Sequence, residues 1–281
     1  MVTSLRLGIR AHDLPATSLT ELLKQAEQYP FTHLHFAPAK LAQIGLGSDL
    51  TPGLANYLHQ QLQSHGLTVS ILGCYVNIVH PNPQIREKNL QHFEDYLSLA
   101  RWFNNPIVAT ETGSVSEDGY SEANFSEAAF DQVVASVRRL ANTAEKLGTV
   151  FAIEPGMNHP ICTLEKTRRL FNLVDSPNMK IICDPVNLIT TENYRQQKQL
   201  IDEFLEDFGE RIITFHLKDF TIRHHRCDVV SFGQGQFARE YFIKAIIARF
   251  PHTFCTFEGI QPQDISPAIA ELRRYVNIDL V

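Results

Sequence analysis

The chain has 281 residues, of which 44% are hydrophobic and 20% are charged, and its net charge is −6. This composition is typical of a folded protein with a large core, and the length suits a single α/β barrel domain, which we expect to span residues 1–281. The negative balance argues against a broad basic surface, so we expect no nucleic-acid partner.

The cysteines and the apolar runs bear on the compartment. The five cysteines are scattered and form no C-x-x-C pair, so neither a disulfide framework nor a structural zinc site is indicated. No apolar run reaches the roughly 18 residues that span a bilayer, and Met1 to Ser4 does not begin a charged-then-apolar leader. We therefore expect a cytoplasmic protein with no membrane partner.

From residue 5 onward, short β-branched segments alternate with longer segments of helical periodicity. The pattern predicts strands over residues 5–10, 32–37, 67–72, 106–109, 150–154, 180–184, 212–216 and 253–258. It predicts helices over residues 18–29, 51–65, 84–103, 125–147, 163–174, 194–208, 236–250 and 265–276.

Eight strands in strict alternation with eight helices predict a (β/α)8 TIM barrel, whose active site lies at the C-terminal ends of the strands. The alternative, an open doubly wound sheet, normally has fewer units and often a glycine-rich turn after its first strand. Residues 11–15 follow the first strand here and contain no glycine, which favours the barrel.

Four consecutive predicted strands end in a titratable or metal-binding side chain: Glu154, Asp184, His216 and Glu258. In a barrel the ends of strands five to eight are neighbours, so we expect these side chains to converge. One strand-end carboxylate often caps a loop, but four in a row are much less readily explained in that way. Three carboxylates and one imidazole suit a hard or borderline divalent ion. We predict one bound metal ion, preferably Mn²⁺, with Mg²⁺, Co²⁺ and Zn²⁺ as alternatives.

The same strand ends carry a resemblance to a known family. The segments are Ile153-Glu154-Pro155, Cys183-Asp184-Pro185-Val186-Asn187, Phe215-His216-Leu217-Lys218-Asp219 and Phe257-Glu258-Gly259, supported by Gly233-Gln234-Gly235-Gln236. The sequence resembles the sugar isomerase/epimerase superfamily of xylose-isomerase-like TIM barrels, which includes ketose 3-epimerases, hydroxypyruvate isomerase, inosose dehydratase and endonuclease IV. The resemblance implies that the four side chains ligate one divalent metal. It also implies that Glu154 and Glu258 are catalytic and exchange protons.

The chemistry of such a site is consistent with this implication. A metal held by a carbonyl and an adjacent hydroxyl oxygen acidifies the carbon between them and stabilises an enediolate. One carboxylate then removes a proton, and a second carboxylate on the opposite face returns one, which inverts the configuration. We therefore predict a metal-dependent isomerase or epimerase of a sugar or sugar phosphate.

Departures from the family pattern limit the alternatives. Asn187 stands where ketose 3-epimerases and endonuclease IV carry a histidine, and residues 72–75 and 110–113 lack the histidines that endonuclease IV needs at strands three and four. We therefore expect one metal. An inosose dehydratase-like lyase stays open as an alternative, an abasic-site nuclease is less favoured, and a non-catalytic sugar-binding barrel would not explain both glutamates.

The remaining candidates are substrate contacts. Lys218 suits a substrate oxygen or carboxylate, although a rim salt bridge would also explain it. Arg223 belongs to a basic run at residues 223–226, which suits phosphate or carboxylate unless it is merely solvated. The other candidates, placed after strands three, four and six, are His80, Glu111 and Asn187.

Three further expectations concern neighbouring residues and assembly. His12 and Asp13 follow the first strand and are candidates for lining the pocket, whereas His33 and His35 are expected to be packed or hydrogen-bonded locally. The resemblance also implies a homo-oligomer, a dimer or a tetramer, with a small-molecule substrate as the partner of the site.

Overall fold

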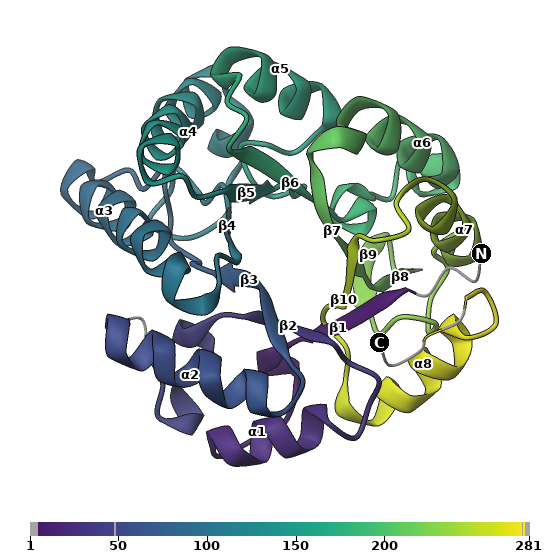
Figure 1. The fold of residues 1–281 in the computed structure, drawn as a ribbon. Coiled ribbons are helices and arrows are strands. Elements are labelled where there is room, and N and C mark those ends of the chain that lie inside the picture. The colour runs from purple at the N-terminus through teal and green to yellow at the C-terminus, as the bar shows by residue number, and fades with distance from the viewer. Residues whose placement is uncertain (1–4, 48, 277, 279–281) are drawn as a thin grey trace.

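A computed structural model describes residues 5–47, 49–276 and 278. Eight parallel strands close a barrel in the order β1-β10-β7-β6-β5-β4-β3-β2, with the helices around it (Figure 1). The single (β/α)8 barrel is thus confirmed, while Met1 to Ser4, where a leader was considered, lie outside the described residues. The strands are β1 (Arg6–Arg10), β2 (His33–Phe36), β3 (Thr68–Gly73), β4 (Ile107–Glu111), β5 (Phe151–Glu154), β6 (Met179–Cys183), β7 (Ile212–Leu217) and β10 (Phe254–Phe257).

The helices begin where the sequence supplies capping side chains. Ser18, Thr51, Asn82, Ser126 and Thr163 each accept a hydrogen bond from a first-turn backbone N–H. Some predicted helices are longer than those observed because 3-10 turns occupy residues 100–103, 122–125 and 194–196. The helices are α1 (Leu19–Ala26), α2 (Pro52–Ser64), α3 (Pro83–Leu99), α4 (Glu127–Leu147), α5 (Leu164–Val174), α6 (Gln197–Phe208), α7 (Arg239–Arg249) and α8 (Ile265–Leu272). None of the helices in the described part of the chain is long and apolar enough to cross a membrane.

The interior of the barrel has an apolar layer below the C-terminal rim. Ile71, Ala109, Ala152 and Ile182, from four neighbouring strands, pack together there and are buried. Alternate residues of a strand face the same side of a sheet, so the residues two positions after Ala152 and Ile182 face the same interior. Those residues are Glu154 and Asp184, which places polar chemistry directly above an apolar floor.

Nearer the N-terminal ends of the strands, His33 fills the interior beside Gly8. A Cβ at Gly8 would lie 2.3 Å from two ring atoms of His33, so only glycine fits there. The His33 ring also makes hydrogen bonds of 3.1 Å with the hydroxyls of Thr32 and Thr256. This residue is therefore packed and hydrogen-bonded, as expected.

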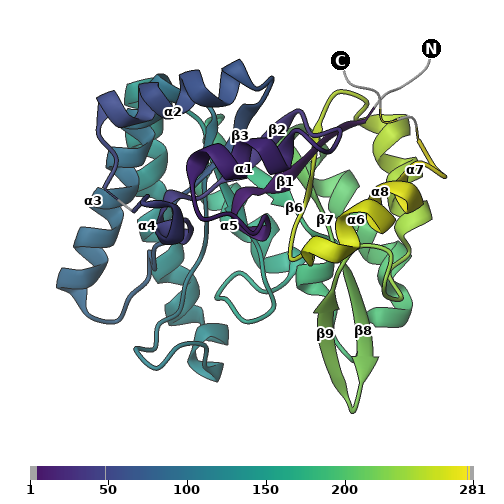
Figure 2. The ribbon, with the colours of Figure 1, turned by 90° about the horizontal axis from the view of Figure 1, so that it is seen from below.

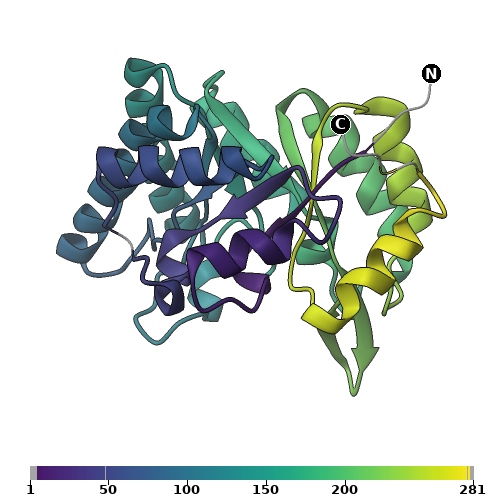
Figure 3. The same ribbon diagram turned by 60° about the horizontal axis from the view of Figure 1, so that its bottom comes forward.

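The basic run at residues 223–226 forms the tip of a β-hairpin. Strands β8 (Asp219–Arg223) and β9 (Arg226–Val230) pair antiparallel, and the hairpin projects away from the barrel in Figures 2 and 3. His224 and His225 form the turn with φ of 48° and 58°. Such turns usually carry Asn-Gly or Asp-Gly, so a His-His turn gave no hairpin signal.

Asp219 fixes this hairpin to the following segment. Its carboxylate accepts hydrogen bonds from the backbone N–H groups of Phe220 (2.8 Å), Gly233 (3.2 Å) and Phe237 (2.7 Å). A Cβ at Gly235 would lie 2.2 Å from the Phe220 carbonyl oxygen. The Gly-Gln-Gly segment noted in the sequence therefore folds tightly over a buried carboxylate.

Candidate metal centre

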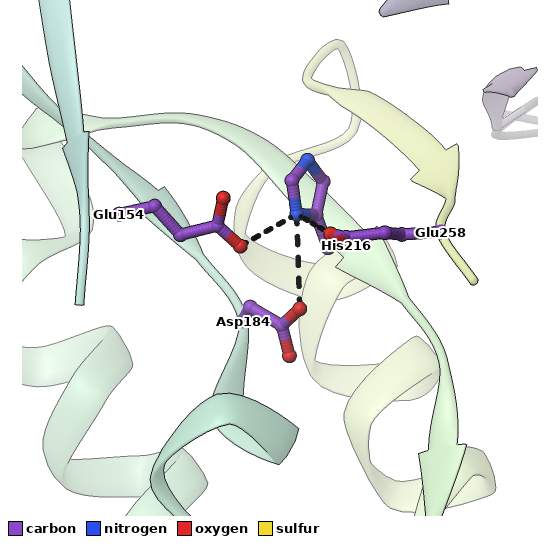
Figure 4. Close-up of side chains that lie close together, drawn as sticks. All are labelled: Glu154, Asp184, His216 and Glu258. Atoms are coloured by element: carbon purple, nitrogen blue, oxygen red, sulfur yellow. Dashed lines mark hydrogen bonds and ion pairs between the residues drawn. The ribbon is translucent and has the colours of Figure 1, made fainter. Parts of the chain in front are cut away.

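The four strand-end side chains converge in the structure. Glu154 ends β5, Asp184 directly follows β6, His216 lies in β7 and Glu258 directly follows β10. All four are buried, and one potential ligand atom from each lies within 4.8 Å of the others (Figure 4). The predicted juxtaposition is therefore present, and the group can hold a metal ion.

His216 is the centre of this cluster. Its Nδ1 lies 2.9 Å from Glu154 Oε1 and 3.7 Å from Asp184 Oδ2, and it also contacts Glu258 Oε2. One ring nitrogen donates at most one proton, so it cannot satisfy three carboxylates. Asp184 Oδ2 and Glu258 Oε2 are buried and make ion-pair contacts with Lys218 and His216, respectively, but no hydrogen bond of normal geometry. Buried oxygens that converge on an imidazole nitrogen form a donor set that fits a divalent cation.

The protonation equilibria also reflect the crowding of these groups. Burial and the adjacent Glu258 carboxylate raise the pKa of Glu154 to about 7. Burial acts to lower the pKa of His216, but Glu154 and Glu258 outweigh it and raise that pKa well above its ordinary value. Burial and like charge both disfavour ionised carboxylates, and a positive charge among them offsets both effects.

Two cations flank the cluster. Lys218 Nζ lies 2.8 Å from Asp184 Oδ2 and 3.3 Å from Glu258 Oε1. Burial acts to lower the pKa of Lys218, but these carboxylates raise it above its ordinary value, so the side chain is an ammonium. Arg10 Nη1 lies 3.0 Å from Glu258 Oε1, and Arg10 Nη2 lies 2.8 Å from Asp13 Oδ1. Arg10 was not among the residues predicted from the sequence, although it lies at the end of its strand.

A hydrogen-bonded chain supports the back of the His216 ring. His216 Nε2 lies 3.4 Å from His35 Nδ1, and His35 Nε2 lies 3.0 Å from the Tyr75 hydroxyl. His35 is therefore packed and hydrogen-bonded, as expected, and one of its partners is a site residue on another strand. Burial and the nearby His216 lower the pKa of His35 well below its ordinary value. A neutral imidazole has one donor and one acceptor nitrogen, so His35 donates a hydrogen bond to one of its two partners and accepts one from the other.

Asn187, a predicted substrate contact, links two of the clustered carboxylates. Its Nδ2 donates to Glu154 Oε1 at 2.8 Å, and its backbone N–H donates to Asp184 Oδ1 at 3.2 Å. It also lines a cavity beside the cluster. The side chain is thus placed to orient Glu154, and its contact with substrate stays a prediction.

Two adjoining cavities of about 270 and 230 Å³ lie beside the cluster. They share Glu111 and Tyr120 as lining residues, and Glu111 is the register partner of Glu154 on the neighbouring strand. His80 lines the first cavity and His159 lines the second. We call this double cavity the rim groove. The sequence offered no signal for Tyr120 and His159, because both lie in loops whose course depends on the tertiary structure.

Arg223 lies apart from these groups. Residues 223–226 are exposed at the tip of the β8–β9 hairpin, and none of them lines the rim groove. The predicted phosphate contact at Arg223 therefore finds no support from its position.

The family follows from a direct comparison. The sequence profile of the family described as "xylose isomerase-like TIM barrel" matches residues 23–275. Since this covers most of the chain, the protein belongs to that family. No curated protein has a sequence that matches this chain.

Solved structures with the same fold have little sequence identity. One is 3-keto-D-glucoside 4-epimerase YcjR from E. coli, with 17% identity, a TM-score of 0.74 and coverage of 96% of this chain and 100% of that chain. Another is the IolI protein with a bound zinc atom, with 16% identity, a TM-score of 0.76 and coverage of 98% and 100%. A third is the probable 3-DHS dehydratase AsbF from Bacillus anthracis, with 18% identity, a TM-score of 0.72 and coverage of 99% and 100%.

Proposed function

We propose that this protein is a divalent-metal-dependent isomerase or epimerase that transfers a proton next to the carbonyl of a sugar. The convergence of Glu154, Asp184, His216 and Glu258 above the barrel floor is the observation that carries this proposal. The family and the fold shared with a 3-keto-D-glucoside 4-epimerase support the reaction class.

The four clustered side chains would hold the ion. When bound, a divalent ion polarises the carbonyl of a substrate and stabilises the negative charge that develops on its oxygen. We prefer Mn²⁺ because three carboxylates and one imidazole form a hard to borderline donor set. The zinc in the IolI structure makes Zn²⁺ the first alternative to compare.

Glu154 and Glu258 are the proposed proton-transfer pair. They approach the cluster from opposite sides (Figure 4), as inversion at a carbon between them requires. Lys218 and Arg10 both contact Glu258 Oε1, which keeps that carboxylate in the ionised form that can accept a proton, while it also lowers its basicity. His216 and Asn187 both contact Oε1 of Glu154, so we assign the returned proton to its Oε2.

The substitution Glu258→Gln tests this assignment. We expect it to lower solvent-deuterium exchange into ketoses by about 10²- to 10⁴-fold, the range for loss of a general base. Sugar binding, measured by calorimetry, should persist, and metal content should be measured on the same sample. Glu192→Gln, an exposed glutamate on the loop after β6, serves as the matched control. Full exchange activity in the Glu258 variant would contradict the assignment.

A lyase remains the second candidate because the fold is shared with a probable dehydratase. The same proton removal followed by loss of a β-hydroxyl would give a product lighter by one water. Mass spectrometry of the products therefore separates the two reactions: an unchanged mass supports the isomerase, and loss of water supports the lyase.

A further inference from the structure

We infer that the rim groove binds an uncharged, polyhydroxylated part of the substrate and rejects a terminal phosphate. This inference rests on the proposed function, since it assigns the substrate class of the same site. It narrows the original expectation of a sugar or sugar phosphate to an unphosphorylated sugar.

The metal centre itself has no spare positive charge for a phosphate. The carboxylates of Glu154, Asp184 and Glu258 would surround a divalent ion, and Arg10 also contacts the carboxylate of Asp13. The positive charges of the ion, Arg10 and Lys218 would together balance the negative charges of these four carboxylates. A phosphate ester adds about −1.5 to −2 charges and is normally held by arginine or lysine. Here both nearby cations are already engaged by carboxylates.

The rim groove supplies no cation of that kind either. No lysine or arginine is among the described residues that line its two cavities, whereas Glu111 and Glu117 are. Glu111 is central because it lines both cavities, and its side chain retains 39% exposure. A dianionic group placed here would face the Glu111 carboxylate, whose ion-pair partner is the single His159 imidazole, and this like-charge contact costs free energy.

The groups around Glu111 suit hydroxyls instead. His159 Nδ1 lies 3.0 Å from the Gly113 carbonyl oxygen, and His159 Nε2 lies 3.5 Å from Glu111 Oε2 and 3.3 Å from the Tyr120 hydroxyl. Burial acts to lower the pKa of His159, but Glu111 outweighs it and the pKa is raised. A carboxylate acceptor, an imidazole donor and a phenol that does both match sugar hydroxyls, each of which donates and accepts.

The other cations near the groove do not line it. Arg86 donates to the carbonyl oxygen of His80 at 2.7 Å, and Lys40 lies over the ring of Tyr75. Arg223, His224, His225 and Arg226 are exposed at the tip of the β8–β9 hairpin and line neither cavity. The hairpin does reach the groove, but through Cys227 and Val229, which line its second cavity and bring no charge.

Calorimetric titration of the Mn²⁺-loaded protein tests the inference. The ligands are D-fructose, D-tagatose and D-psicose, each compared with its 6-phosphate. We expect at least one free sugar to bind at least tenfold more tightly than its phosphate. Equal or tighter binding of the phosphates, or no binding of any free sugar, would overturn the inference.

Variants at Glu111 make the test specific. Glu111→Gln should weaken binding of the free sugar at least fivefold, and Glu111→Lys should shift the preference toward the phosphate at least tenfold. Glu122→Gln, an exposed glutamate of the same loop region that lines neither cavity, should leave both affinities unchanged. Unaltered selectivity in both Glu111 variants would remove Glu111 from the inference. Binding does not require turnover, so selective binding without deuterium exchange would refute only the proposed reaction.

Discussion

At the scale of the residue, the geometry of the proposed metal centre depends on the orientation of the His216 imidazole. His216 Nδ1 faces three carboxylates, while its Nε2 faces His35, which in turn contacts the Tyr75 hydroxyl. A metal-binding histidine normally uses its second nitrogen to fix the ring and its tautomer. His35 is therefore a positioning residue for the proposed metal ligand, not a substrate contact.

The substitution His35→Phe keeps an aromatic ring but removes both hydrogen bonds of the chain. We expect Mn²⁺ affinity to fall about 10- to 100-fold, as is typical when the partner of a metal-binding histidine is lost. Competition calorimetry with a chelator measures this change. Tyr75→Phe removes only the outer hydroxyl and should have a smaller effect. Wild-type affinity in the His35 variant would show that the chain does not orient His216.

At the scale of the element, the period of the strands and the anchoring of one hairpin are decisive. Because side chains alternate along a strand, residues in or next to six parallel strands face the same interior of the barrel. These residues are Arg10, His35, Glu154, Asp184, His216 and Glu258. The buried carboxylate of Asp219 anchors the hairpin β8–β9, because it accepts hydrogen bonds from three backbone N–H groups. Because this hairpin contributes to the rim groove through Cys227 and Val229, its anchoring also bears on the proposed substrate site.

Asp219→Ala should loosen this region because it leaves buried N–H groups without an acceptor. An unsatisfied buried group costs about 1–3 kcal/mol, so we expect hydrogen exchange of the hairpin amides to accelerate at least tenfold. Asp228→Ala is the control, because it removes a carboxylate of the same hairpin that forms an ion pair with Arg226. The hairpin amides of this variant should exchange at the wild-type rate. Equal protection in both variants would contradict the anchoring role.

At the scale of the whole molecule, closure of the barrel buries a neutral imidazole, that of His33, below the metal centre. Burial lowers the pKa of His33 to about 3, while its ordinary value of 6.5 applies to the unfolded chain. Between these values the unfolded state binds a proton that the folded state does not. The free energy of unfolding therefore falls as the pH decreases from about 6.5 toward about 3, and the His33 contribution is fully present above pH 6.5.

This dependence predicts a difference between two stability curves. Wild-type stability should lose up to about 1.4 kcal/mol per pH unit more than His33→Gln across this range, which corresponds to one proton taken up on unfolding. Urea denaturation at pH values from about 4 to about 8, roughly one unit apart, measures how the free energy of unfolding changes with pH. His252→Gln, at an exposed histidine, controls for loss of a surface imidazole. Parallel curves for wild type and His33→Gln would refute the prediction.

The sequence by itself determined the barrel and its proposed metal ligands. Regular alternation of strand and helix patterns has few compact solutions, and a closed barrel brings consecutive strand ends together. The four predicted ligands were therefore predictable as neighbours, because each lies at or next to the C-terminal end of its strand: Glu154, Asp184, His216 and Glu258.

Only the tertiary structure decided what surrounds these four side chains. Contacts between His35 and His216, and between Glu111 and His159, join residues that are 181 and 48 positions apart or lie in irregular loops. The β8–β9 hairpin also places Arg223 at an exposed tip, outside the rim groove. Strand periodicity specifies which way a strand residue faces, whereas the course of a loop depends on packing and hydrogen bonds that a local pattern does not encode.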